Sequence, residues 1–347
     1  MNVLIKEVIS KSDLVKFLRF PFTLYKDNPY WVPALEIDEK ISLSRTKNPA
    51  FEFCEARYWL AFMNGKIVGR IAGIINHHAN ECWNEKRVRF GWIDFIDNED
   101  VAKILLNTVE KWGKENGCNE IHGPLGFMDM DREGMLVFGF DKLGTYATIY
   151  NHEYYPIIIE KLGFLKDVDW IQFEYDVPKN LPNELSNMVD LISKRYKIHT
   201  LKATKSKQLF KYANQIFDVL NQGYKQLYGF TSLTEKQIAL FSKQYMSYII
   251  PDFVSIILNE KDEVVAFGIS MPSLSIGVQK AKGRLFPFGW WHIIKSIKNC
   301  SLIDMCLISI RPDMQKKGLN AIIFHELITN YIKKGVKKAI VNPILEV

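Results

Sequence analysis

The sequence is poor in the residues that mark secreted, disulfide-bonded or metal-binding proteins. It has 5 cysteines and 7 histidines among 347 residues, and no two cysteines stand in the CxxC spacing that is typical of zinc and redox sites. The cysteines are Cys54, Cys82, Cys118, Cys300 and Cys306. We expect reduced thiols in a cytoplasmic protein. We expect no metal, because His77 and His78 are neighbours in an expected strand and would point to opposite faces.

Long apolar runs are also absent. No stretch approaches the roughly 20 apolar residues that a membrane-spanning helix needs. Residues 1–7 lack the basic, apolar and small-residue pattern of a signal peptide. The prediction is a cytoplasmic protein, with at most peripheral contact at the inner membrane face.

Neither sign of charge dominates the sequence. There are 45 Lys and Arg against 39 Asp and Glu, a net charge of +6. Because no five basic residues follow one another, nucleic acid is not an expected partner. The small excess of positive charge favours the binding of an anionic small ligand. A hydrophobic content of 48% over 347 residues predicts two globular domains.

The expected elements occur twice in the same order, which predicts an internal duplication of strand, two helices, hairpin, strand, helix and strand. In the first copy, Asn64-Gly65 joins strands at 56–63 and 66–75. A strand at 170–176 is expected to close the first sheet. The second copy stops soon after a strand at 338–341, so we expect it to be truncated or completed by a partner.

Two prolines in the segment 178–183 predict a linker between the copies. The N-terminal domain is then 1–177, and the C-terminal domain is 184–347 with an insertion at 271–300. The predicted fold class is α/β (α+β), with two mixed twisted sheets flanked by helices.

Residues 302–321 predict an anion site. An apolar strand leads through Pro312 into a basic loop with Gly318, and an amphipathic helix follows. Free backbone N–H groups and the positive end of the helix dipole then meet at one point, where phosphate commonly binds. The alternative is a solvated loop. The first copy has carboxylates at the same place, which would repel a pyrophosphate; they are Asp94, Asp97, Glu99 and Asp100.

This arrangement resembles the GNAT superfamily of N-acetyltransferases, in which a Gln/Arg-x-x-Gly-x-Gly/Ala loop holds the pyrophosphate of acyl-CoA. The matching residues are Gln315, Lys316, Lys317, Gly318 and Leu319, whereas Asn320 departs from the sixth place and Ala321 follows it. The resemblance implies acetyl-CoA or a longer acyl-CoA as co-substrate, bound by residues 315–321. It also implies that a backbone N–H near Ile308 or Ile310 polarises the thioester carbonyl.

The whole chain is similar to a bacterial tandem-GNAT family that includes bacterial ceramide synthase-like proteins. The similar segments are 123–127 with Asp129, 139–141, 150–151 with 154–155, 283–290 and 342–346. This similarity implies an acyl-CoA-dependent N-acyltransferase with an amine acceptor, a long-chain sphingoid-type amine being one option. Two alternatives stay open: a non-catalytic CoA- or lipid-binding protein, and a transferase with a charged-tRNA donor. The net charge of +6 gives the second little support.

Proton-transfer candidates lie in the loops 123–131 and 150–155, where we expect the acceptor. An amine must lose a proton as it attacks a thioester, and a histidine or carboxylate of shifted pKa can take it. Asp129, His152 and Tyr154 are the predicted catalytic residues, with Glu153 as a further proton-transfer group. The alternative is that these residues cap turns and pack.

The insertion 271–300 is basic and rich in aromatic residues. Such an amphipathic stretch can line an acyl tunnel, rest on a membrane interface, or cap the sheet between the two copies.

Overall fold

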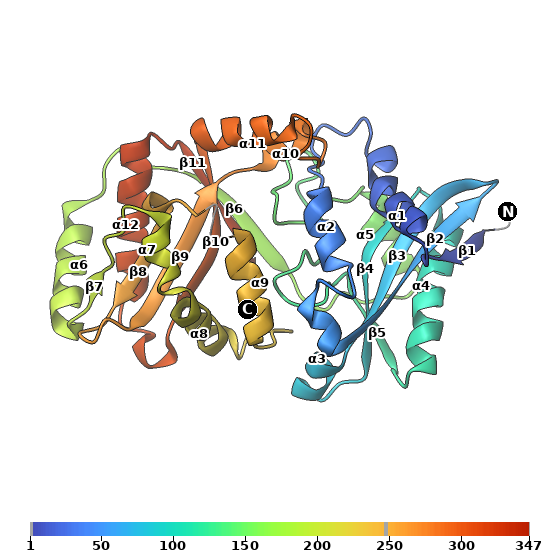
Figure 1. Cartoon of the computed structure of the whole chain (residues 1–347), viewed down its shortest axis with the longest axis horizontal. Coiled ribbons are helices and arrows are strands. Elements are labelled where there is room, and N and C mark those ends of the chain that lie inside the picture. Colours follow the sequence, from blue (N-terminus) through green and yellow to red (C-terminus); the bar gives the residue numbers. More distant parts are fainter. Residues whose placement is uncertain (1–2, 246–248, 347) are drawn as a thin grey trace. The chain divides into compact units, whose positions relative to one another are not determined.

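The computed structural model describes residues 3–245 and 249–346. Two compact units make up the chain (Figure 1). Unit 1 comprises the residues up to Asp169 together with 274–294, and unit 2 comprises 170–273 with 295–347. Each unit is built on one mixed sheet with helices against it, so the predicted fold class is confirmed.

Unit 1 is organised around a five-stranded sheet of order β1-β2-β3-β4-β5, in which only β4 and β5 run parallel. Its strands are β1 Leu4–Glu7, β2 Cys54–Met63, β3 Lys66–Asn76, β4 Arg87–Phe95 and β5 Glu120–His122. The turn between β2 and β3 has positive φ at Asn64 (52°) and Gly65 (76°). That conformation suits a two-residue hairpin, as the Asn-Gly pair predicts.

The helices of unit 1 are α1 Lys11–Leu24, α2 Glu36–Ser42, α3 His77–Cys82, α4 Glu99–Glu115, α5 Tyr154–Lys161 and α10 Ser275–Lys280. Helix α4 lies against the sheet (Figure 1). It buries Val101, Leu105 and Val109 in the core with strand residues such as Phe90. His77 and His78 begin α3, so the expectation that they belong to a strand is wrong. The strand ends because the Asn76 side chain caps the helix at the Ala79 N–H.

Residues 274–294, most of the expected insertion, belong to unit 1. The Gln279 amide donates to the backbone oxygens of Pro29 and Trp31. The Glu36 N–H donates to the Gly283 oxygen at 2.8 Å, and Arg284 pairs with the Glu36 carboxylate at 2.9 Å. Helix α11, Gly289–Lys298, begins within this stretch and extends beyond it.

Unit 2 contains a six-stranded sheet of order β6-β11-β10-β9-β8-β7. Its strands are β6 Trp170–Asp176, β7 His199–Thr200, β8 Val254–Leu258, β9 Val264–Pro272, β10 Leu302–Ile310 and β11 Lys338–Leu345. The strand at 170–176, expected to close the first sheet, instead pairs antiparallel with β11. It is the edge strand of the second sheet, next to β11. The units accordingly divide before β6, ahead of the segment 178–183 for which we expected a linker.

The helices that lie wholly in unit 2 are α6 Asn183–Tyr196, α7 Ser206–Phe210, α8 Ala213–Tyr224, α9 Glu235–Tyr245 and α12 Leu319–Lys334. Helix α12 packs against one face of the sheet through Leu319, Ile322 and Ile323, and α6 lies beside it (Figure 1). Helix α8 packs on the opposite face, where the Ser309 hydroxyl donates to the Val219 oxygen at 2.9 Å. Within residues 3–245 and 249–346, no helix is long and apolar enough to cross a membrane.

Candidate active site in unit 2

Strands β10 and β11 begin as a parallel pair and then separate. They are paired from Leu302 with Lys338 to Met305 with Val341. Beyond this point β11 continues beside β6 and β10 continues beside β9. A bulge in β10 lies between Met305 and Leu307, at the place of separation, and bulges commonly re-aim a strand beside a functional site. Among the described residues, no strand therefore pairs with one edge of the second half of β10, which we call the open edge.

Backbone groups of Ile308 and Ile310 face this open edge. The Arg311 N–H donates to Val265 in β9, and hydrogen bonding alternates along an antiparallel pair. In agreement, the Ile308 oxygen accepts from the Tyr224 hydroxyl at 3.0 Å and the Ile310 oxygen accepts from the Gln315 amide at 3.2 Å. The N–H groups of both isoleucines consequently point away from β9.

The loop after β10 gathers further N–H groups. A short 3-10 helix at Pro312–Met314 leads into Lys316 and Gly318, both with positive φ (61° and 82°). No side chain caps α12 at Gly318. Within the described part of the chain, nothing accepts from the backbone N–H groups of residues 316–320. Two left-handed residues, Lys316 and Gly318, just before an uncapped helix start leave backbone N–H groups available to an anion.

Asp304 lies at the closed end of the open edge. It is 4% exposed, and its Oδ1 atom has no hydrogen-bond partner among the described residues. Burial raises the pKa of its carboxyl to about 6, and a hydrogen bond with Ser273 opposes the rise. From the register of β9 and β10, Asp304 shares the face of Ser309, which carries α8. A carboxylate with this pKa is half ionised near pH 6 and mostly ionised at neutral pH, where it can accept a proton.

In unit 1, the corresponding edge of strand β4 is covered by other parts of the chain. Strand β4 passes directly through residues 96–98 into α4, whose N-terminus is capped by the Asn98 side chain at the Val101 N–H. Beside β4, the Leu125 N–H donates to the Phe90 oxygen at 2.8 Å. A Cβ at Gly91 would lie 2.3 Å from the Leu125 oxygen. The chain itself therefore occupies the strip beside β4 that stays open beside β10.

The predicted catalytic residues lie in unit 1 and fall into two groups. The His152 ring stacks on Tyr25 at 4.7 Å and on Tyr154 at 5.3 Å, and the Tyr154 hydroxyl donates to the Phe95 oxygen at 2.6 Å. Asp129 belongs to a carboxylate group with Asp131 and Glu133. Burial raises the pKa of Asp129 to about 6, with Arg89 opposing the rise. Burial and the Asp129 charge raise the pKa of Glu133 to about 9.

Asp304 is the site group that sequence reasoning missed. A single carboxylate interrupts the apolar run 302–308, and a buried carboxylate is costly unless it is paired or serves a function. That interruption was the available signal.

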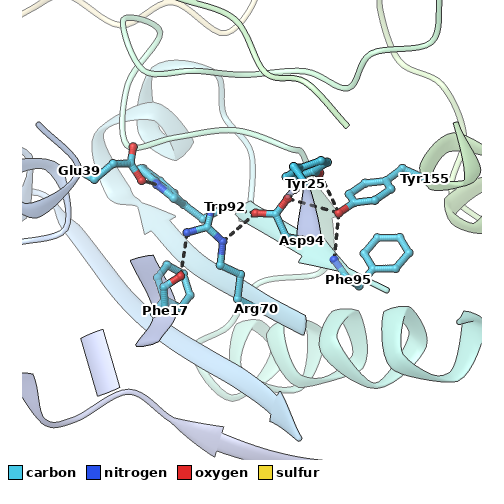
Figure 2. Close-up of polar contacts among 8 residues, drawn as sticks. All are labelled: Phe17, Tyr25, Glu39, Arg70, Trp92, Asp94, Phe95 and Tyr155. Carbon is cyan, nitrogen blue, oxygen red and sulfur yellow. Dashed lines mark hydrogen bonds and ion pairs between the residues drawn. The ribbon is translucent and has the colours of Figure 1, made fainter. Parts of the chain in front are cut away.

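A buried ion pair forms the polar centre of unit 1. Figure 2 shows Asp94 between Arg70 on one side and Tyr25 and Tyr155 on the other. The Arg70–Asp94 distance is 2.7 Å, with side chains 9% and 10% exposed. The Phe95 N–H also donates to the Tyr155 hydroxyl at 3.0 Å. Asp94 is thus paired within the core, and it does not lie at the start of α4 with Glu99 and Asp100 as the sequence indicated.

Replacing Asp94 with Ala is expected to lower the free energy of unfolding by about 3–5 kcal/mol, because the Arg70 charge would stay buried without a partner. Urea denaturation followed by tryptophan fluorescence measures this. The matched control is Glu110→Ala in the exposed pair with Lys114, which should cost less than about 0.5 kcal/mol. Equal losses in the two variants would contradict a structural role for the buried pair.

Comparison with known proteins shows which family the chain belongs to. No protein-family model matches the sequence. Protein YghO of Escherichia coli (strain K12) is 30% identical over 326 residues, which are 92% of this chain and 82% of YghO. The bacterial ceramide synthase of Caulobacter vibrioides (strain NA1000 / CB15N) is 26% identical over 310 residues, which are 85% and 78% of the two chains.

Solved structures show the fold. A tandem GNAT protein from the clavulanic acid biosynthesis pathway matches 98% of this chain and 89% of its own, with a TM-score of 0.51 and 9% identity. A GCN5-related glucosamine N-acetyltransferase region of a fungal β-N-acetylglucosaminidase matches 99% of this chain and 35% of its own, with a TM-score of 0.53 and 12% identity. The fold is a tandem GNAT fold. The chain belongs to the tandem-GNAT family of YghO and bacterial ceramide synthase.

Proposed function

We propose that the protein is an acyl-CoA-dependent N-acyltransferase whose chemistry takes place in unit 2. The observation that carries the proposal is the open edge of β10, with an anion-binding loop at one end and Asp304 at the other. Family membership supports the reaction class, because a relative is named a ceramide synthase and forming a ceramide acylates an amine.

The loop would hold the pyrophosphate of acetyl-CoA or a longer acyl-CoA through the N–H groups of residues 316–320, with Gln315 and Ala321 at its ends. Lys316 is exposed and would add charge to the phosphate contact. N–H groups along the open edge, those of Ile308 and Ile310 among them, would hydrogen-bond the amides and the thioester carbonyl of the bound molecule. The Asn320 side chain departs from the loop pattern but does not conflict with this proposal, because residue 320 contributes its backbone N–H group.

Asp304 would act as general base. The amine nitrogen forms a bond to the thioester carbon and gives its proton to the Asp304 carboxylate. The carbon–sulfur bond then breaks and CoA leaves with its electron pair. The proton held by Asp304 passes to the departing sulfur, which gives the thiol and restores the carboxylate. A base with a pKa of about 6 is ionised at neutral pH and still accepts this proton readily. Proton transfer by Asp129, His152 or Tyr154 stays a prediction from the sequence.

A long-chain, sphingoid-type amine is the acceptor that we propose, on the strength of the ceramide synthase relative. The test is to incubate the protein with acetyl-CoA or palmitoyl-CoA and a panel of short and long amines. Mass spectrometry then measures the amide product and the released CoA. We expect product with long-chain amines. Acyl-CoA binding without product from any amine would instead support the non-catalytic binding protein.

A further inference from the structure

A cluster of exposed apolar side chains lies on the stretch from Phe286 into α11. It consists of Phe286 (79% exposed), Phe288 (75%), Trp290 (45%), Trp291 (51%) and Ile294 (41%). Other strongly exposed hydrophobic residues, such as Phe138 and Leu165, are not concentrated in this way. Single exposed apolar residues are ordinary on a protein surface, whereas a contiguous group marks an interaction site.

The spacing on α11 places these side chains on one face of the helix. At 100° per residue, Trp290, Ile294 and Lys298 follow one another on a narrow stripe, and Trp291 and Lys295 lie beside it. Ile293 lies on the adjoining face, about 100° from Ile294, and is buried. The helix therefore buries one side in the protein and turns an aromatic, lysine-edged side to solvent.

Within this stretch of the sequence, the charged residues have a single sign. No Asp or Glu occurs between residues 273 and 303. The same stretch carries exposed cations, namely Lys280, Lys282, Arg284, Lys295 and Lys298. Tryptophan and lysine together favour the boundary between headgroups and acyl chains, and clustered cations attract anionic lipids.

The stretch before the helix is fixed to unit 1 and does not hang free. Gln279 holds the backbone of Pro29 and Trp31, and Arg284 pairs with Glu36. The Trp290 indole donates to the Pro287 oxygen at 3.0 Å, which orders the bend before the helix. A pre-organised apolar surface loses little entropy on binding.

We propose that residues 286–298, the aromatic patch, dock the protein onto an anionic phospholipid bilayer, with the aromatic rings at the acyl boundary and the lysines on the headgroups. This interaction is separate from acyl-CoA chemistry and does not depend on it. It would bring a lipophilic amine within reach of an enzyme that has no membrane-spanning helix among its described residues.

Co-sedimentation with vesicles tests the proposal with the full chain. We expect binding to mixed phosphatidylcholine–phosphatidylglycerol vesicles, weaker binding to phosphatidylcholine alone, and release by added salt. The double variant Lys295→Ala/Lys298→Ala should lose about 25-fold in affinity, at about fivefold per cation. The double variant Phe286→Ser/Phe288→Ser should lose at least about tenfold.

Matched controls keep the result specific. Lys66→Ala/Lys261→Ala removes two exposed lysines elsewhere, and Phe138→Ser removes one exposed ring; both should bind vesicles as the wild type does. Circular dichroism checks that every variant is folded. No vesicle binding by the wild type, or equal losses in patch and control variants, overturns the proposal. Light scattering that shows self-association abolished by the patch variants, without vesicle binding, assigns the patch to a second copy of the chain instead.

Discussion

Asp304→Asn is expected to lower kcat by about 10²–10⁴-fold while acyl-CoA still binds, because the amide cannot accept the amine proton. The wild-type rate should rise with pH through about 6, where the Asp304 carboxyl ionises, and the residual rate of the variant should lack that step. Steady-state kinetics with mass-spectrometric product detection measure both. An unchanged kcat would remove Asp304 from the mechanism.

The same variant is expected to be more stable than the wild type at pH 7.5. Burial raises the pKa of Asp304 from 3.8 to about 6 in the folded protein, so the folded state holds this proton more tightly than the unfolded state does. The contribution of Asp304 to stability therefore falls as pH rises from about 4 to about 6 and then stays low. Removing the carboxylate should raise the free energy of unfolding by up to about 3 kcal/mol at pH 7.5 and by almost nothing below pH 4.

Asp262→Asn is the matched control. Asp262 is exposed, lies in the turn between β8 and β9, and has a φ of 59° that Asn tolerates. This variant should leave kcat unchanged. It should change the free energy of unfolding by no more than about 0.5 kcal/mol. If Asp304→Asn instead destabilises the fold at pH 7.5, the carboxylate has a structural role.

Gly318→Trp is expected to weaken acyl-CoA binding by about 100-fold or more, because a side chain at the start of α12 would cover several charge-assisted N–H contacts. Even a Cβ at Gly318 would lie 2.8 Å from the Ile192 Cδ1 atom. Isothermal titration calorimetry with acetyl-CoA and with palmitoyl-CoA measures the change. Equal affinity in wild type and variant would exclude this loop as the pyrophosphate site.

The two ends of α12 supply a matched pair for this experiment. Gly318 and Gly335 both have positive φ, 82° and 72°, at the N- and C-terminal caps of the same helix. Alanine in this conformation should cost about 1 kcal/mol of stability at Gly335, and more at Gly318, where the Ile192 side chain must also shift. Only Gly318→Ala should also weaken acyl-CoA binding. A similar loss of affinity in Gly335→Ala would mean that helix stability, and not the loop, controls binding.

Local patterns predicted those parts of the fold that depend on nearby residues. The hairpin at Asn64-Gly65, the duplicated order of elements and the loop before α12 follow from turn chemistry and periodicity, which act over a few residues. The placement of β6 beside β11 could not be predicted in this way, because an edge strand of either sheet has the same alternation and length. Only the long-range pairing of Ala339 with Tyr175 and its neighbours distinguishes the two sheets.

In the candidate site, too, the sequence predicted what depends on local residues and missed what depends on tertiary structure. The loop motif predicted N–H groups at 316–321. The structure presents those of 316–320 without partners in the described chain, whereas the Ala321 N–H donates to the Gly318 oxygen. Asp304 was overlooked because its meaning depends on burial and on a missing partner, which are tertiary properties. His152 lies in a loop and Tyr154 begins α5, and the structure gives them stacking and backbone contacts.

The central claim is that unit 2 binds acyl-CoA and unit 1 does not. Calorimetric titration of wild-type protein with acetyl-CoA and with palmitoyl-CoA tests it most directly. The account predicts saturable binding at one site per chain, lost in Gly318→Trp. Two sites per chain, or no binding of either thioester, would contradict it.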